Sequence, residues 1–63
     1  MYNSQNAMWN SVVSKLPQNK IDVLILCDNE EEKIAWYDKD KNAWFSKGFL
    51  VIPNVLFWKH MNL

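Results

Sequence analysis

The sequence predicts a small, mainly β domain built on an antiparallel sheet, and three observations lead to that prediction. Short apolar blocks of strand length follow one another between residues 21 and 61, polar turn-forming clusters separate them, and nine of the 63 side chains are aromatic. A chain of this length forms one domain, which buries only about 60% of the surface of the unfolded chain. Because the single cysteine allows no internal disulfide, the aromatic side chains must supply much of the core.

The composition of the N-terminal region divides it into two parts, residues 1–7 and residues 8–17. Residues 1–7 are polar and rich in Asn, Gln and Ser, so we expect a flexible lead-in to a single domain over 8–63. In the segment 8–17, apolar residues recur at helical spacing, whereas Pro17 and two adjacent valines oppose a helix. We therefore expect either an extended segment or a short helical turn beginning at Ser11, packed on one face of the sheet.

The remainder of the chain predicts a four-stranded antiparallel meander. The predicted strands cover residues 21–28, 32–38, 43–47 and 55–61. The first is apolar on both faces, which indicates a central place in the sheet. In the second, the alternation places Ile34 and Trp36 on one face and Ala35 and Tyr37 on the other.

Turn-forming residues connect the predicted strands. An acidic turn at 28–31 joins the first two strands, and the polar loop 38–42 makes a second hairpin. Gly48 is the only glycine and predicts a bend, because it alone adopts positive φ freely. An apolar connection over 49–54 then leads to the last strand.

Charge and hydropathy limit the class of partner and the compartment. The seven basic residues are all lysines, and seven acidic residues balance them to a net charge of zero, which argues against nucleic acid as the main partner. No apolar run approaches the ~20 residues of a membrane span, and the first residues lack the pattern of a signal peptide. These features predict a cytoplasmic protein without membrane contact.

The residues with catalytic potential have simpler structural explanations. Cys27 lies within an apolar strand, where burial makes a thiol inert, and His60 has no companion ligands at recognisable metal-binding spacing. Asp38 and Asp40 belong to a loop in which aspartate serves turn formation. The sequence therefore predicts a protein that is not an enzyme and that holds no metal and no cofactor.

The order of several short motifs resembles a known family. The motifs are Trp9-x-Ser11-Val12, Leu16-Pro17, Val23-Leu24-Ile25, Ala35-Trp36-Tyr37-Asp38, Trp44-Phe45 and a terminal strand with Trp58. Together they resemble the domain of unknown function 551 family, short proteins found largely in bacteriophages, prophages and their bacterial hosts. The chain departs from the family pattern at Phe57, where members carry histidine, and it lacks their Leu-Pro pair after the last tryptophan. The resemblance implies a phage or mobile-element origin and brings no catalytic residues with it.

Two interpretations of the aromatic side chains remain open. Trp36, Trp44 and Trp58 can stack across strands as core, or the short covering segments can leave an exposed aromatic patch with Tyr37, Phe45 and Trp58 as its members. The acidic turn with Glu30 and Glu31 is either a solvated loop or a negative prong for a basic partner. The candidate partner-binding residues are Tyr37, Phe45, Trp58, Trp36, Trp44, Glu30 and Glu31.

The resulting functional prediction is stoichiometric binding to a host protein, such as a defence factor, through an aromatic surface. One alternative is a small nucleotide or single-stranded nucleic-acid binder in which tryptophans stack on bases and lysines such as Lys33, Lys39, Lys47 and Lys59 meet phosphate. Another is a homodimer that completes its sheet by pairing across an edge.

Overall fold

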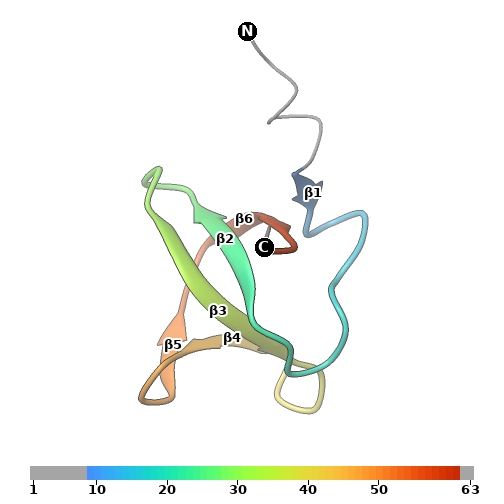
Figure 1. The fold of residues 1–63 in the computed structure, drawn as a ribbon, viewed down its shortest axis with the longest axis vertical. Helices are drawn as coiled ribbons and strands as arrows, with labels where there is room; N and C mark the ends of the chain where they lie inside the picture. The colour runs from blue at the N-terminus through green and yellow to red at the C-terminus, as the bar shows by residue number, and fades with distance from the viewer. Residues whose placement is uncertain (1–8, 62–63) are drawn as a thin grey trace, which may run out of the picture.

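A computed structural model describes residues 9–61, which form one six-stranded antiparallel sheet (Figure 1). The strands are β1 (Asn10–Ser11), β2 (Val23–Cys27), β3 (Glu32–Asp38), β4 (Ala43–Ser46), β5 (Leu50–Ile52) and β6 (Val55–Lys59). Their order in the sheet is β1-β6-β2-β3-β4-β5. Across residues 9–61 there is no helix, and so none that could span a membrane.

The sheet is rolled rather than flat. Only Pro53 and Asn54 separate β5 from β6 in the chain, yet β2, β3 and β4 lie between them in the sheet. The two ends of the sheet must therefore curl toward each other. Strand β3 makes the bend, because its first half pairs with β2 as far as Ala35 and its last three residues pair with β4. In Figure 1, β4 accordingly lies across the lower end of the β2–β3 ribbon, and β5 stands upright at the lower left.

The core lies inside this curl and receives side chains from five strands. Its members are Val23, Ile25, Cys27, Ala35, Tyr37, Trp44, Ile52, Val55 and Trp58. Strand β2 contributes every second residue and lies between β6 and β3, which confirms its predicted central place. Leu24 and Leu26, on its other face, are half-buried.

A bulge in β6 explains why both Val55 and Trp58 point into the core. In a regular strand, residues three apart lie on opposite faces. Here Cys27 pairs with Val55 and Leu26 with Phe57, so Leu56 has no counterpart on β2. The extra residue restores a common face for Val55 and Trp58, and it leaves Leu56 43% exposed.

The structure confirms the predicted small, mainly β, antiparallel fold and corrects its arrangement. Residues 9–61 form six strands rather than four, because Leu50–Ile52 forms β5 where a connection was expected and Asn10–Ser11 forms the short strand β1. The last strand does not extend a meander beyond β4 but returns beside β2. Gly48 and Phe49 have φ of +86° and +61°, and this tight reversal turns the chain back onto β4.

The N-terminal segment is extended and then turns. Asn10 and Ser11 pair with β6, and the carbonyl of Ser11 accepts hydrogen bonds from the backbone N–H groups of Ser14 and Lys15, both at 3.0 Å. The segment forms a turn in place of a helical element, because Pro17 follows closely and is buried against the domain. The predicted lead-in 1–7 lies outside the described residues.

Candidate functional site

The rolled sheet separates two rows of apolar side chains that cross the same three strands. On the inner face, Tyr37 of β3 pairs with Trp44 of β4, which pairs with Ile52 of β5. One residue away in each strand, Trp36, Phe45 and Val51 form the corresponding row on the outer face. The inner row is buried, whereas Trp36 and Phe45 are half-buried and Val51 is 62% exposed. The outer row is therefore apolar surface that the described part of the chain leaves uncovered.

Phe49 joins this row and completes a group of three rings that we call the aromatic platform: Trp36, Phe45 and Phe49. The rings of Trp36 and Phe45 stack with centroids 6.3 Å apart and an interplanar angle of 24°. Phe49 stands almost perpendicular to Trp36, at 5.8 Å and 88°. Both geometries are favourable for aromatic pairs, so the rings support one another in one arrangement.

Phe49 is held in a conformation that phenylalanine rarely adopts. Its N–H donates to the carbonyl of Ser46 at 2.9 Å, and its φ of +61° lies in the left-handed region. That region costs an L-residue roughly 1–2 kcal/mol. The ring is nevertheless 78% exposed, so core burial does not offset the cost. The stabilising interaction that Phe49 makes in this conformation is its edge-to-face contact with the Trp36 ring.

Charged side chains border the platform around a shallow hollow of about 420 Å³. Lys20, Asp22, Asp38 and Lys41 line this hollow together with the three rings. The backbone N–H of Lys20 donates to the carbonyl of Tyr37 at 2.8 Å, which fixes the 17–22 loop beside β3. The hollow thus combines an apolar floor with a rim of both charges, as in many protein-binding surfaces.

Three of the predicted partner-binding residues lie in the core instead. Tyr37, Trp44 and Trp58 are 6%, 8% and 1% exposed, so a partner cannot reach them in the folded protein. The Tyr37 ring packs on the Trp44 ring inside the domain, with centroids 5.2 Å apart. The Tyr37 hydroxyl donates a hydrogen bond to the side chain of Asn42. Of the predicted aromatic set, the structure brings Trp36 and Phe45 together on the outside.

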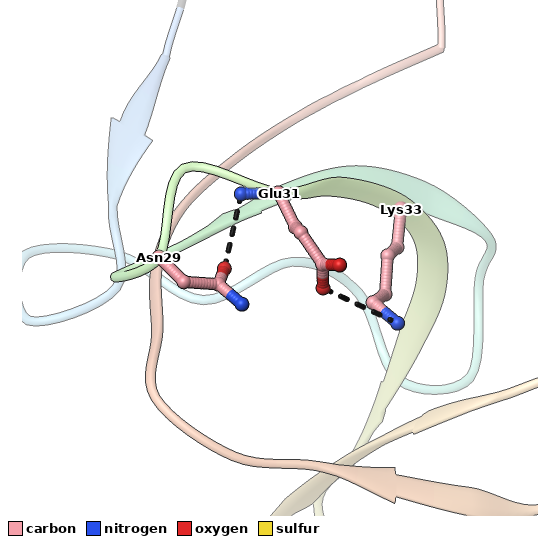
Figure 2. Close-up of polar contacts among 3 residues, drawn as sticks. All are labelled: Asn29, Glu31 and Lys33. Carbon is pink, nitrogen blue, oxygen red and sulfur yellow. Dashed lines mark hydrogen bonds and ion pairs between the residues drawn. The ribbon is translucent and has the colours of Figure 1, made fainter.

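The other two predicted residues, Glu30 and Glu31, are exposed on the β2–β3 hairpin. The Glu31 N–H donates to Oδ1 of Asn29 at 3.0 Å. The Glu31 carboxylate faces Lys33 (Figure 2). The Glu31–Lys33 ion pair is 3.6 Å long and open to solvent, which limits its contribution to stability. This hairpin presents charge at a different place from the aromatic platform.

The buried thiol of Cys27 is a titratable group whose surroundings change its pKa. Burial raises the pKa of the Cys27 thiol, and the nearby Asp28 and Glu31 carboxylates act in the same direction against an opposing effect of Lys33. The structure therefore confirms the predicted core position of Cys27, where burial favours the neutral thiol. No group of three His, Cys, Asp or Glu side chains among residues 9–61 is placed to hold a metal ion.

Sequence reasoning missed Phe49 and Lys20 of the hollow. Phe49 fell within a predicted connection, and the signal that could have identified it is its place directly after the only glycine, at the start of an apolar run. Lys20 and Lys41 lie in separate loops, and only the backbone bond between Lys20 and Tyr37 brings the first of these loops to the hollow.

Comparison of the chain with family models, curated proteins and solved structures gives no match.

Proposed function

We propose that the protein is a non-enzymatic, cytoplasmic accessory protein of phage or mobile-element origin that binds a host protein stoichiometrically through the aromatic platform. The single observation that carries this proposal is Phe49, an exposed aromatic ring held in a costly backbone conformation against Trp36. Strained backbone at an exposed position is typical of functional sites. The proposed origin rests on the family resemblance of the sequence.

Aromatic side chains of this kind are the usual anchors of protein interfaces. Trp and Tyr, with Phe to a lesser degree, contribute a large apolar area at low entropic cost, and they act best when the partner excludes water around them. The platform offers three such rings already fixed by mutual contact. Because they are pre-arranged, a partner that covers them loses little conformational freedom on binding.

The rim of the hollow supplies the polar part of this proposed interface. Lys20 and Lys41 lie beside Asp22 around the rings, and exposed rim charges of this kind steer association and select partners rather than adding much affinity. The proposed mechanism is occlusion: the bound domain covers a functional surface of its target.

A pull-down from nuclease-treated bacterial lysate tests the proposal with two matched variants. Phe49→Ser removes an exposed ring of the platform, and Val13→Ser removes an apolar side chain that is 91% exposed and lies outside it. Circular dichroism first establishes that both variants fold. We expect one host protein to be retained at equal molar amounts by the wild type and by Val13→Ser, and lost from Phe49→Ser. Equal retention by all three would contradict the proposed surface.

One observation favours a second candidate, a binder of nucleotides or single-stranded nucleic acid. Lys20 and Lys41 line the same hollow as the three rings, so a base stacked on Trp36 would have ammonium groups near its phosphate. The fluorescence of the half-buried Trp36 can be used to follow binding of a base. Titration with oligothymidine would quench its fluorescence at micromolar concentration, with the quenching abolished in Trp36→Phe; unchanged fluorescence would remove this candidate.

A further inference from the structure

Strand β5 is the last strand of the sheet, and no strand among residues 9–61 pairs with its outer edge. Its residues are Leu50, Val51 and Ile52, so the edge carries no charge. Natural edge strands are normally protected by lysines, prolines or bulges, because free backbone groups beside apolar side chains attract other strands. Here the proline comes only after the strand, and Leu50 and Val51 are 64% and 62% exposed.

A groove of about 440 Å³ runs along this edge. One wall is the continuous segment from Leu50 to Asn54, and the other is the β2–β3 hairpin. The N–H of Asp28 donates to the carbonyl of Asn54 at 3.0 Å, which holds the two walls together at one end. The volume lies in the range of small-ligand sites, about 300–1,000 Å³.

The hairpin wall gives the groove its charge. Asp28, Asn29, Glu31 and Lys33 line it, and Glu30 and Glu32 are exposed on the same hairpin. Figure 2 shows the side chains of Asn29, Glu31 and Lys33 extending from one side of the hairpin. The carboxylates of Asp28 and Glu31 outnumber the single ammonium group of Lys33, which lies 3.6 Å from Glu31, so the net charge of this wall is negative.

We propose that this groove binds an extended, basic peptide segment of a partner protein, which adds to β5 as a further strand. Backbone groups of β5 would pair with the segment, its apolar residues would continue the outer row that ends at Val51, and its Lys or Arg side chains would face Asp28 and Glu31. The site is separate from the aromatic platform and goes beyond the proposed function.

A second copy of this chain fits the groove less well than a basic segment. Pairing of two β5 edges would bring two acidic hairpins, each with four carboxylates against one lysine, to a single interface. Like charges at such short range oppose association. Charge therefore selects a basic segment over self-association.

The test uses three fluorescein-labelled peptides of about seven residues, the length of an ordinary strand. The first alternates lysine and valine, the second replaces lysine with glutamate, and the third repeats the first with N-methylated backbone amides. Anisotropy titration measures binding to the full chain, and amide chemical shifts locate it. We expect the first peptide to bind and to shift residues 27–33 and 50–54. The anionic and N-methylated peptides should bind at least about tenfold more weakly.

Protein variants separate this site from the aromatic platform. Val51→Lys places a charge on the exposed edge, and Glu31→Lys reverses a charge of the wall; both should weaken binding of the first peptide about tenfold. Phe49→Ser should bind it as the wild type does. Equal binding of the N-methylated peptide, or shifts outside the groove, would overturn the proposal. Sedimentation showing a wild-type dimer that Val51→Lys dissociates would also overturn it, because a second copy would then be the occupant.

Discussion

The indole nitrogen of Trp58 donates a hydrogen bond to the backbone carbonyl of Lys15 at 2.8 Å, joining the last strand to the N-terminal segment. Trp58 is 1% exposed, so this bond lies at the end of a ring that is otherwise surrounded by the core. Trp58→Phe keeps an aromatic ring but loses the donor and part of the volume. We expect it to lower the free energy of unfolding by about 2–4 kcal/mol.

The matched control is Trp36→Phe, which makes the same substitution on the outer face of the sheet. Trp36 is half-buried and donates no hydrogen bond within the described residues, so the expected loss is about 1 kcal/mol or less. Urea unfolding followed by far-UV circular dichroism measures both variants without relying on tryptophan emission. Equal losses would show that the bond to Lys15 contributes little.

The sequence predicted which residues share a face more reliably than which face lies inside. Alternation correctly grouped Ile34 with Trp36 and Ala35 with Tyr37. Both faces carry a large aromatic side chain, however, so hydrophobicity alone did not choose between them. The choice follows from the direction in which the sheet rolls, which encloses Tyr37 and leaves Trp36 outside. Roll direction depends on pairings distant in sequence, which alternation does not encode.

Local sequence patterns also do not specify how the last two strands are arranged. Strand β5 is only three residues long, and the reversal before it needs positive φ at Phe49, which no propensity rule assigns to phenylalanine. The bulge at Leu56 interrupts the alternation of inward-facing and outward-facing residues in β6, so the sequence pattern does not show which of them share a face. The candidate site was therefore predicted in part, at Trp36 and Phe45, and Phe49 emerged only with the turn geometry.

Asp38 provides a second measurable contribution to stability, at the start of the β3–β4 loop. Its Oδ1 accepts hydrogen bonds from the N–H groups of Asp40 and Lys41 at 3.0 and 3.2 Å, and the residue is 6% exposed. Asp38→Ala leaves both donors without this partner, so we expect a loss of about 1–2 kcal/mol in thermal or urea unfolding. Asp38→Asn retains the accepting oxygen and should recover most of it. Asp40→Ala removes the same charge from an exposed position and should change stability by only about 0.5 kcal/mol.

Glu30 offers the opposite case, a substitution that should stabilise the fold. It ends the β2–β3 turn with φ of +70°, where a side chain costs roughly 1–2 kcal/mol and glycine is strain-free. Glu30→Gly should raise the free energy of unfolding by about 0.5–1 kcal/mol after the added entropy of the unfolded chain is counted. Glu31→Gly removes the same charge without relieving left-handed backbone and should lower stability. A Glu30→Gly variant no more stable than Glu31→Gly would contradict this account of the turn.

The thiol of Cys27 should make stability depend on pH in the alkaline range only. Burial raises its pKa in the folded protein above the ordinary value of 9.0, with Asp28 and Glu31 adding to the effect against Lys33. The unfolded chain therefore loses the thiol proton first as pH rises. Below the unfolded pKa both states are protonated and stability is unaffected; above it the folded state loses stability until its own pKa is reached.

Comparing urea midpoints of the wild type and Cys27→Ala at pH 7.5 and 10 isolates this effect, since other groups titrate equally in both. We expect the advantage of the wild type to shrink at pH 10, and iodoacetamide to modify Cys27 only in urea. An advantage independent of pH, with rapid alkylation of the folded protein, would mean that the thiol is reachable from solvent.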